Sequence, residues 1–226
     1  MTMPYYVAPE QVMKDRAEYA QKGIARGRSL VAVTYDEGIL VVAENPSRTL
    51  HKISEIDDRV CFAGVGKYNE FDQLRVAGIR HADTKGYAYS RDDVDARSLA
   101  NLYAQHLGQV FTHEMKPLEV EILVAELGST AQGNRLYHIA YDGTVVDEQD
   151  STVLGGDADA IAGRLDRAFA EGWGVRDALR ACVACLAGPE RTLTADEIEV
   201  AALSRGNGRR TFRRLEGAEL AGLLAT

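Results

Sequence analysis

Cys182 and Cys185 have the CxxC spacing that redox pairs use and that supplies half of a structural zinc site. A zinc site needs two further ligands, and neither a second CxxC pair nor closely spaced histidines accompany this one. Both cysteines instead fall within an apolar stripe at helical spacing that runs from Val175 to Leu186. Small thiols are common in cores, so the pattern predicts packing for both cysteines, and neither a metal nor a cofactor is expected.

Other short motifs for catalysis are incomplete. The segment from Gly27 through Ser29 begins like the nucleophile elbow G-x-S-x-G, but it ends in Val31 and precedes a predicted strand, whereas the elbow follows one. Gly64-Val-Gly66 begins a dinucleotide fingerprint, yet Asn69 stands where its third glycine is required. The five histidines are scattered along the chain, which favours structural roles for them. The sequence therefore indicates neither a serine hydrolase nor a dinucleotide-binding enzyme.

Lys52 is the basic residue that comes immediately before a predicted turn and strand. From the residues alone, the simplest interpretation is an exposed lysine. The cluster Arg205, Arg209, Arg210, Arg213 and Arg214 surrounds a Gly-Asn-Gly turn. A solvated or interface hairpin explains that cluster better than a nucleic-acid site, because the chain carries a net charge of −8.

The predicted strands and helices are grouped in blocks along the sequence. Hydrophobic periodicity predicts strands at 29–34, 39–43, 60–65, 118–127, 136–141, 144–146, 198–203 and 211–215, and helices at 67–81, 95–112, 158–170, 175–186 and 216–224. Blocks of strands joined by short hairpin turns favour antiparallel sheets over a parallel, doubly wound sheet. Two sheets packed face to face with helices outside would use every element, so the predicted fold class is α+β, a four-layer αββα sandwich.

Length and composition limit the class of protein. The chain has 226 residues, of which 46% are hydrophobic and 27% charged, as expected for one globular domain. Purely apolar runs, such as 39–43 and 122–125, are far shorter than the roughly 18 residues of a membrane helix. The N-terminus has no basic and apolar signal peptide, and three cysteines are too few for a disulfide framework. A cytoplasmic location, with no membrane and no nucleic-acid partner, is expected.

Several segments, in this order and spacing, resemble those of the actinobacterial 20S proteasome α subunit. They include Glu18-Tyr19-Ala20, Ala25-Arg26-Gly27, the hairpin from Ser29 to Ala43, Lys52-Ile53, Gly64-Val-Gly66, and the segments 44–48, 69–72, 82–89 and 116–121. The resemblance covers essentially the whole chain, from Pro4 to Leu224. The fold of that family is the αββα sandwich that the block order predicts.

The resemblance implies a non-catalytic subunit. Seven copies would form an outer ring on rings of proteolytic β subunits, gate the entry of unfolded protein substrates, and receive the C-terminal tails of a hexameric ATPase for degradation of tagged, pupylated proteins. The β subunits attack with an N-terminal threonine whose free amine acts as base, whereas the matching position here, near Gly27 and Arg28, is internal. The alternative is a self-processing N-terminal nucleophile peptidase or amidase, for which Ser29 is the nearby candidate. A stand-alone binding domain that uses the arginine hairpin is a third possibility.

The resemblance also implies two sites. Lys52, Glu18 and Gly66 match the pocket between neighbouring α subunits in which a lysine pairs with the terminal carboxylate of an activator tail. Residues 1–8 are expected to form a gate tail, and residues 9–226 one domain that includes an N-terminal helix over 9–25. The gate residues are Pro4, Tyr5, Tyr6, Val7, Ala8 and Pro9. The Tyr-Asp-Arg gate motif of archaeal and eukaryotic relatives is missing from this tail, so their gate geometry does not carry over.

Overall fold

The computed structural model describes residues 8–225. Its α-helices are α1 (Pro9–Ile24), α2 (Tyr68–Ala88), α3 (Ala96–His113), α4 (Ala158–Ala168), α5 (Val175–Ala187) and α6 (Gly217–Leu224). Its strands are β1 (Leu30–Tyr35), β2 (Gly38–Glu44), β3 (Ile53–Asp57), β4 (Val60–Gly66), β5 (Val120–Glu126), β6 (Arg135–Ile139), β7 (Val145–Glu148), β8 (Ser151–Leu154), β9 (Ile198–Ser204) and β10 (Phe212–Leu215).

The strands form two antiparallel sheets of five strands each. One sheet has the order β10-β9-β2-β1-β8, and the other has the order β3-β4-β5-β6-β7. Successive side chains of a strand point to opposite faces, and β1 shows this directly. Leu30 and Ala32 belong to the core between the sheets, whereas Val31 and Val33 face the helices. Both faces of β1 are therefore buried, which explains why it reads as a continuous apolar run.

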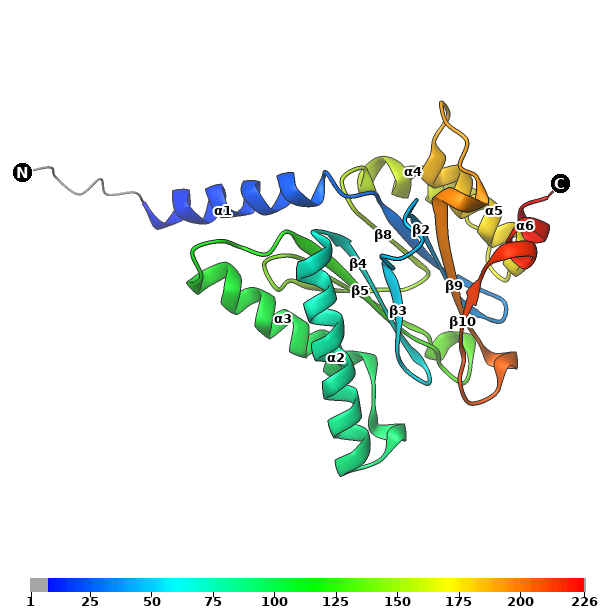
Figure 1. The fold of residues 1–226 in the computed structure, drawn as a ribbon, viewed down its shortest axis with the longest axis horizontal. Helices are drawn as coiled ribbons and strands as arrows, with labels where there is room; N and C mark the ends of the chain where they lie inside the picture. Colours follow the sequence, from blue (N-terminus) through cyan, green and yellow to red (C-terminus); the bar gives the residue numbers. More distant parts are fainter. Residues whose placement is uncertain (1–7, 226) are drawn as a thin grey trace, which may run out of the picture.

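Helices cover the outer face of each sheet (Figure 1). Buried residues of α4, α5 and α6 share one core cluster with the first sheet, and those of α2 and α3 share another with the second sheet. A third cluster fills the space between the two sheets. The order helix, sheet, sheet, helix confirms the predicted αββα sandwich.

The CxxC pair lies in the core, as predicted. Cys182 and Cys185 are buried on α5 against the first sheet, and both are free thiols. Burial raises the pKa of the Cys182 thiol, and of Cys185 as well, so neither is a ready nucleophile. Among residues 8–225, no group of three or more His, Cys, Asp or Glu side chains is arranged to hold a metal ion.

Three elements differ from the predicted ones. β3 was not predicted, because a register shift between Glu55 and Asp57 interrupts its alternation of apolar and polar residues. β8 was not predicted either: only Gln149 and Asp150 separate it from β7, and neither glycine nor proline marks that turn. α2 continues past His81 to Ala88, where its apolar face ends because the helix extends beyond the sheet it covers (Figure 1). Tyr87 near that end is 95% exposed.

α1 packs on the sandwich mainly through its C-terminal half. Ala20 and Ile24 are buried, and Met13 and Ala17, on the same face, are half-buried. The opposite end of the helix points away from the body (Figure 1). Pro9 occupies its first turn, where the missing N–H of proline removes no hydrogen bond, and Ala8 is its N-cap. None of the helices found in residues 8–225 has the combination of length and hydropathy that a membrane crossing requires.

Candidate functional site

Lys52 is the last residue of the segment 45–52, which joins β2 to β3 and is called the docking loop below, after the role predicted for Lys52. Its side chain is half-buried, and Nζ donates a hydrogen bond of 2.5 Å to the backbone carbonyl of Arg28. Burial lowers the pKa of Lys52 to about 8, although the carboxylates of Glu199 and Glu44 act to raise it. The ammonium is therefore charged at neutral pH and only partly solvated.

Glu44 forms an ion cluster beside this lysine. Its side chain is 6% exposed and accepts hydrogen bonds of 3.0 and 3.1 Å from Arg191, and a further one from Arg28. Burial alone would raise the pKa of Glu44, but Arg191 and Arg28 hold it below its usual value. This carboxylate is therefore already neutralised, and the charge of Lys52 is left without an ion-pair partner within 4 Å among the described residues.

Gly66, the second predicted site residue, is the last residue of β4. Its φ angle is +104°, and a Cβ atom there would lie 1.9 Å from the backbone oxygen of Glu119. A side chain is therefore excluded by the backbone itself, whatever the ligand. Gly66 lines a cavity of about 410 Å³ together with Tyr19, Gly23, Arg26, Gly27, Lys67 and Glu119.

Glu18, the third predicted site residue, lies on the exposed face of α1. Its carboxylate pairs with Lys22 at 3.7 Å, and it does not line the cavity beside Gly66. Lys52 is connected to that cavity indirectly: it binds Arg28, and the adjacent Gly27 packs against Gly66. Within the single chain, the three residues do not meet in one cavity. Of the predicted gate residues, Pro4, Tyr5, Tyr6 and Val7 lie outside the described residues.

Ser29, the candidate nucleophile of the alternative reading, is buried just before β1. Its side chain packs against Gly155, and within residues 8–225 no hydrogen bond joins it to a histidine. α1 precedes it in the chain, so its backbone nitrogen is a peptide nitrogen and not a free amine. Among the described residues, Ser29 therefore has no neighbouring general base that could activate its hydroxyl as a nucleophile.

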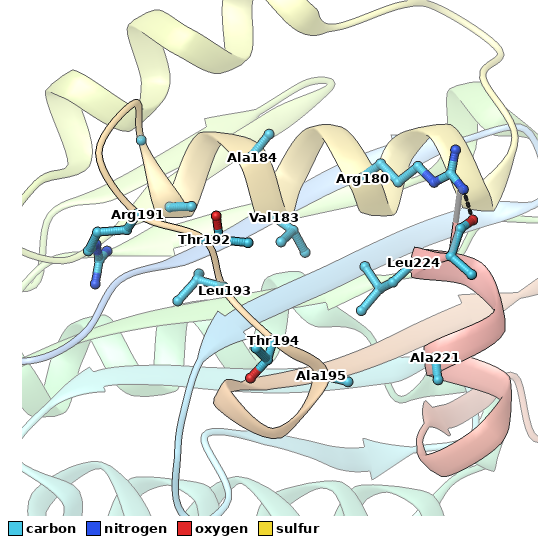
Figure 2. A pocket seen from close by; sticks show the side chains of 13 residues that line it. Arg180, Val183, Ala184, Arg191, Thr192, Leu193, Thr194, Ala195, Ala221 and Leu224 are labelled. Atoms are coloured by element: carbon cyan, nitrogen blue, oxygen red, sulfur yellow. Dashed lines mark hydrogen bonds between the residues drawn. The ribbon is translucent and has the colours of Figure 1, made fainter.

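A second cavity, of about 580 Å³, lies between α5, α6 and the segment 188–195 (Figure 2). Its wall is mostly apolar, with Val183 and Leu224 pointing into the space between α5 and α6 (Figure 2). Arg180 at one end donates to the carbonyls of Leu223 and Ala225 and so fixes the last turn of α6. Among residues 8–225, the wall holds no carboxylate, histidine or thiol and none of the predicted site residues, so these residues offer no catalytic group there.

The arginine hairpin around β9 and β10 is paired internally. Each of its five arginines has a side-chain partner within the chain. The pairs are Arg205 with Asn134, Arg209 with Asp58, Arg210 with Glu55, Arg213 with Glu219, and Arg214 with Glu199. Four of these five arginines are thus paired with carboxylates of the chain, and Arg205 is held by neutral oxygens, so little of the positive charge of the hairpin is left for phosphate binding.

Comparison with known proteins identifies the family. The sequence model described as "Proteasome subunit" matches residues 24–203. The chain is 64% identical over 221 residues to a protein of Acidimicrobium ferrooxidans named "Proteasome subunit alpha", covering 97% of this chain and 95% of the relative. The chain belongs to the proteasome α-subunit family. A protein of the same name from Xylanimonas cellulosilytica is 56% identical, over 97% of this chain and 95% of the relative. Another, from Streptosporangium roseum, is 55% identical, over 100% of this chain and 88% of the relative.

The resemblance to proteasome α subunits in the sequence is thereby confirmed, whereas the roles of Lys52, Glu18 and Gly66 stay predictions. Sequence reasoning missed the charged neighbours of Lys52, Glu44 and Glu199. Both stand in otherwise apolar strands, and a carboxylate in such a position is expected to have a specific partner. That signal was available in the sequence, but it does not name the partners. Glu44 and Arg191, and likewise Glu199 and Lys52, lie more than 140 residues apart in the chain.

Proposed function

We propose that this chain is a non-catalytic α-ring subunit of a 20S proteasome core particle. Seven copies form the outer ring on rings of β subunits, gate the entry of unfolded proteins, and dock a hexameric ATPase that delivers tagged, pupylated proteins. Residues 9–226 form the ring domain and residues 1–8 the gate tail. Support comes from the identity of 64% to an α subunit over nearly the whole chain. The particle works in the cytoplasm, where the three thiols of the chain stay reduced.

The chain itself does not catalyse peptide hydrolysis. An N-terminal nucleophile needs a free amine at the residue that attacks, and here α1 is covalently attached ahead of β1. The cleaving residues therefore belong to the β subunits. The burial of Ser29 supports the same conclusion, because a nucleophile must reach its substrate.

Lys52 is the docking residue for the C-terminal carboxylate of an ATPase tail. The observation that carries this role is its half-buried ammonium, which uses one of three N–H donors on the Arg28 carbonyl and has no carboxylate within 4 Å among the described residues. A carboxylate that reaches it forms a charge-assisted hydrogen bond in a partly desolvated place. Glu18 and Gly66 complete the pocket at the boundary with a neighbouring subunit.

The first test is Lys52→Ala in the assembled particle. We expect it to abolish ATPase-stimulated degradation of folded, tagged protein and to leave cleavage of small peptides unchanged, because those peptides enter without the ATPase. Arg48→Ala is the matched control, since Arg48 is a cation of the same docking loop whose side chain is 83% exposed. Equal stimulation of the Lys52→Ala particle and its parent would refute the docking role.

A further inference from the structure

One buried carboxylate anchors the docking loop from a distant strand. Glu199 is the second residue of β9, which lies between β10 and β2 in the first sheet, and its side chain is 8% exposed. Its Oε2 accepts hydrogen bonds of 2.8 Å from Asn45 Nδ2 and of 2.8 Å from the backbone N–H of Lys52. Its Oε1 accepts one of 3.2 Å from the backbone N–H of Ile53. The same carboxylate thus binds the first residue of the loop, the last one, and the residue that follows.

Arg214 on β10 completes the anchor. It donates a hydrogen bond of 2.6 Å to Oε1 of Glu199 and another to the backbone carbonyl of Ile53. Both backbone groups of Ile53 are therefore held by this ion pair. Glu199 and Arg214 belong to one sheet and Ile53 opens β3 of the other, so the pair fixes the loop where the two sheets meet.

A buried carboxylate destabilises a fold unless its charge and its lone pairs are satisfied. Glu199 is satisfied by Arg214 and by donors of the docking loop, with His51 Nδ1 at 3.3 Å from Oε1 as a further neighbour. Arg214 offsets part of the charge of Glu199 and so weakens its repulsion of an approaching carboxylate. What the anchor adds is a fixed backbone at Lys52, which reduces the conformational entropy lost when a ligand binds there.

We propose that Glu199 is a positioning residue of the docking site, which holds the docking loop so that the Lys52 ammonium is presented to a peptide carboxylate. This inference rests on the proposed docking function of Lys52. It assigns Glu199 no contact with the ligand, only with the backbone that carries Lys52.

The charged groups around Lys52 give a second readout. Glu199 and Glu44 favour the protonated amine and Arg28 opposes it, while Arg214 and His51 contact the carboxylate of Glu199. Replacing Glu199 by glutamine removes one of the two favourable charges. The pKa of Lys52 is then expected to fall below its value of about 8.

The test compares Glu199→Gln with Glu121→Gln. Glu121 is a matched control: its side chain is 18% exposed, it accepts a backbone hydrogen bond from Gly155, and it lies in the other sheet. In the assembled particle, Glu199→Gln should raise the half-saturating ATPase concentration about tenfold with little change in the maximal stimulated rate. Glu199→Asp keeps the charge, so its half-saturating ATPase concentration should lie between those of Glu199→Gln and the parent. If the glutamine variant does not assemble, the aspartate variant decides alone.

The titration of Lys52 separates this inference from the docking role. The chain has six lysines, so ¹³C reductive methylation and NMR resolve each methylamine against pH in the ring without any ATPase. A lower midpoint for Lys52 in Glu199→Gln and an unchanged one in Glu121→Gln support the inference. The inference is overturned if Glu199→Gln and Glu121→Gln give the same half-saturating ATPase concentration and the same Lys52 midpoint. If only Glu199→Asp assembles, the inference is overturned when that variant matches the parent in both measurements. Failure of the docking role itself would appear as undiminished stimulation in Lys52→Ala.

Discussion

The ammonium of Lys52 donates a 2.5 Å hydrogen bond to the backbone carbonyl of Arg28, two residues before β1 begins. This contact joins the loop between β2 and β3 to the connection that leads from α1 into the sandwich. The proposed docking residue is therefore attached to the segment 25–29, which joins α1 to β1. A ligand that competes for the ammonium would act on that connection directly.

The docking role predicts a pH dependence. Only the protonated amine pairs with a carboxylate, and the pKa of Lys52 is about 8, so stimulation by the ATPase should be complete below that pH and decline as the pH rises through it. The measurement is the ratio of ATPase-stimulated degradation to small-peptide cleavage from roughly pH 6.5 to 9.5. Lys52→Arg should remove the decline, because arginine stays charged over this range. A ratio that stays flat for the parent chain would contradict the account.

The gate tail predicts an effect of deletion. Tyr5, Tyr6 and Val7 are unusually apolar for a chain terminus, and in a ring several copies can pack together across the axis. Deleting residues 1–8 should speed hydrolysis of long unstructured peptides by the assembled particle and leave that of very short peptides nearly unchanged. Identical rates for long peptides before and after deletion would refute the gating role of residues 1–8.

Gly66 predicts a loss of stability. Gly66→Ala forces a Cβ against the oxygen of Glu119 at a φ of +104°, which should lower the free energy of unfolding by about 2 kcal/mol or more. Thermal unfolding of the isolated chain measures this. Gly206→Ala is the control, because a Cβ at Gly206 meets nothing within 4 Å. Equal melting temperatures for the two variants would show that β4 can shift to accept the methyl group.

A contact between α2 and α3 predicts coupled substitutions. The hydroxyl of Tyr103 is buried without a hydrogen-bond partner among the described residues, and a Cβ at Gly78 would lie 1.8 Å from it. Tyr103→Phe should therefore raise the free energy of unfolding by about 1 kcal/mol, and Gly78→Ala should lower it by about 1 to 3 kcal/mol. In the double variant the loss should be smaller than the sum, and strict additivity in a double-mutant cycle would refute the contact.

The layers of the sandwich could be predicted because the strands and helices carry their own periodicity. The 29–43 hairpin is buried on both faces, so its apolar run was visible in the sequence. β3 was not visible, since its bulge removes the alternation, and the end of α2 was missed because its contacts, such as that of Lys85 with Asp95, are polar and leave Tyr87 exposed. Lys52 was found through family resemblance, whereas Glu199 was not found at all. Its role depends on a contact across 147 positions that no local pattern encodes.

The most direct test of the α-ring assignment is the native mass of the complex that this chain forms in its host, with N-terminal sequencing of every component. We predict a very large particle in which this chain keeps the residues ahead of β1 and is paired with a second chain that begins with threonine. A small particle made of this chain alone, with an N-terminus near Ser29, would contradict the account and identify the chain as an enzyme in its own right.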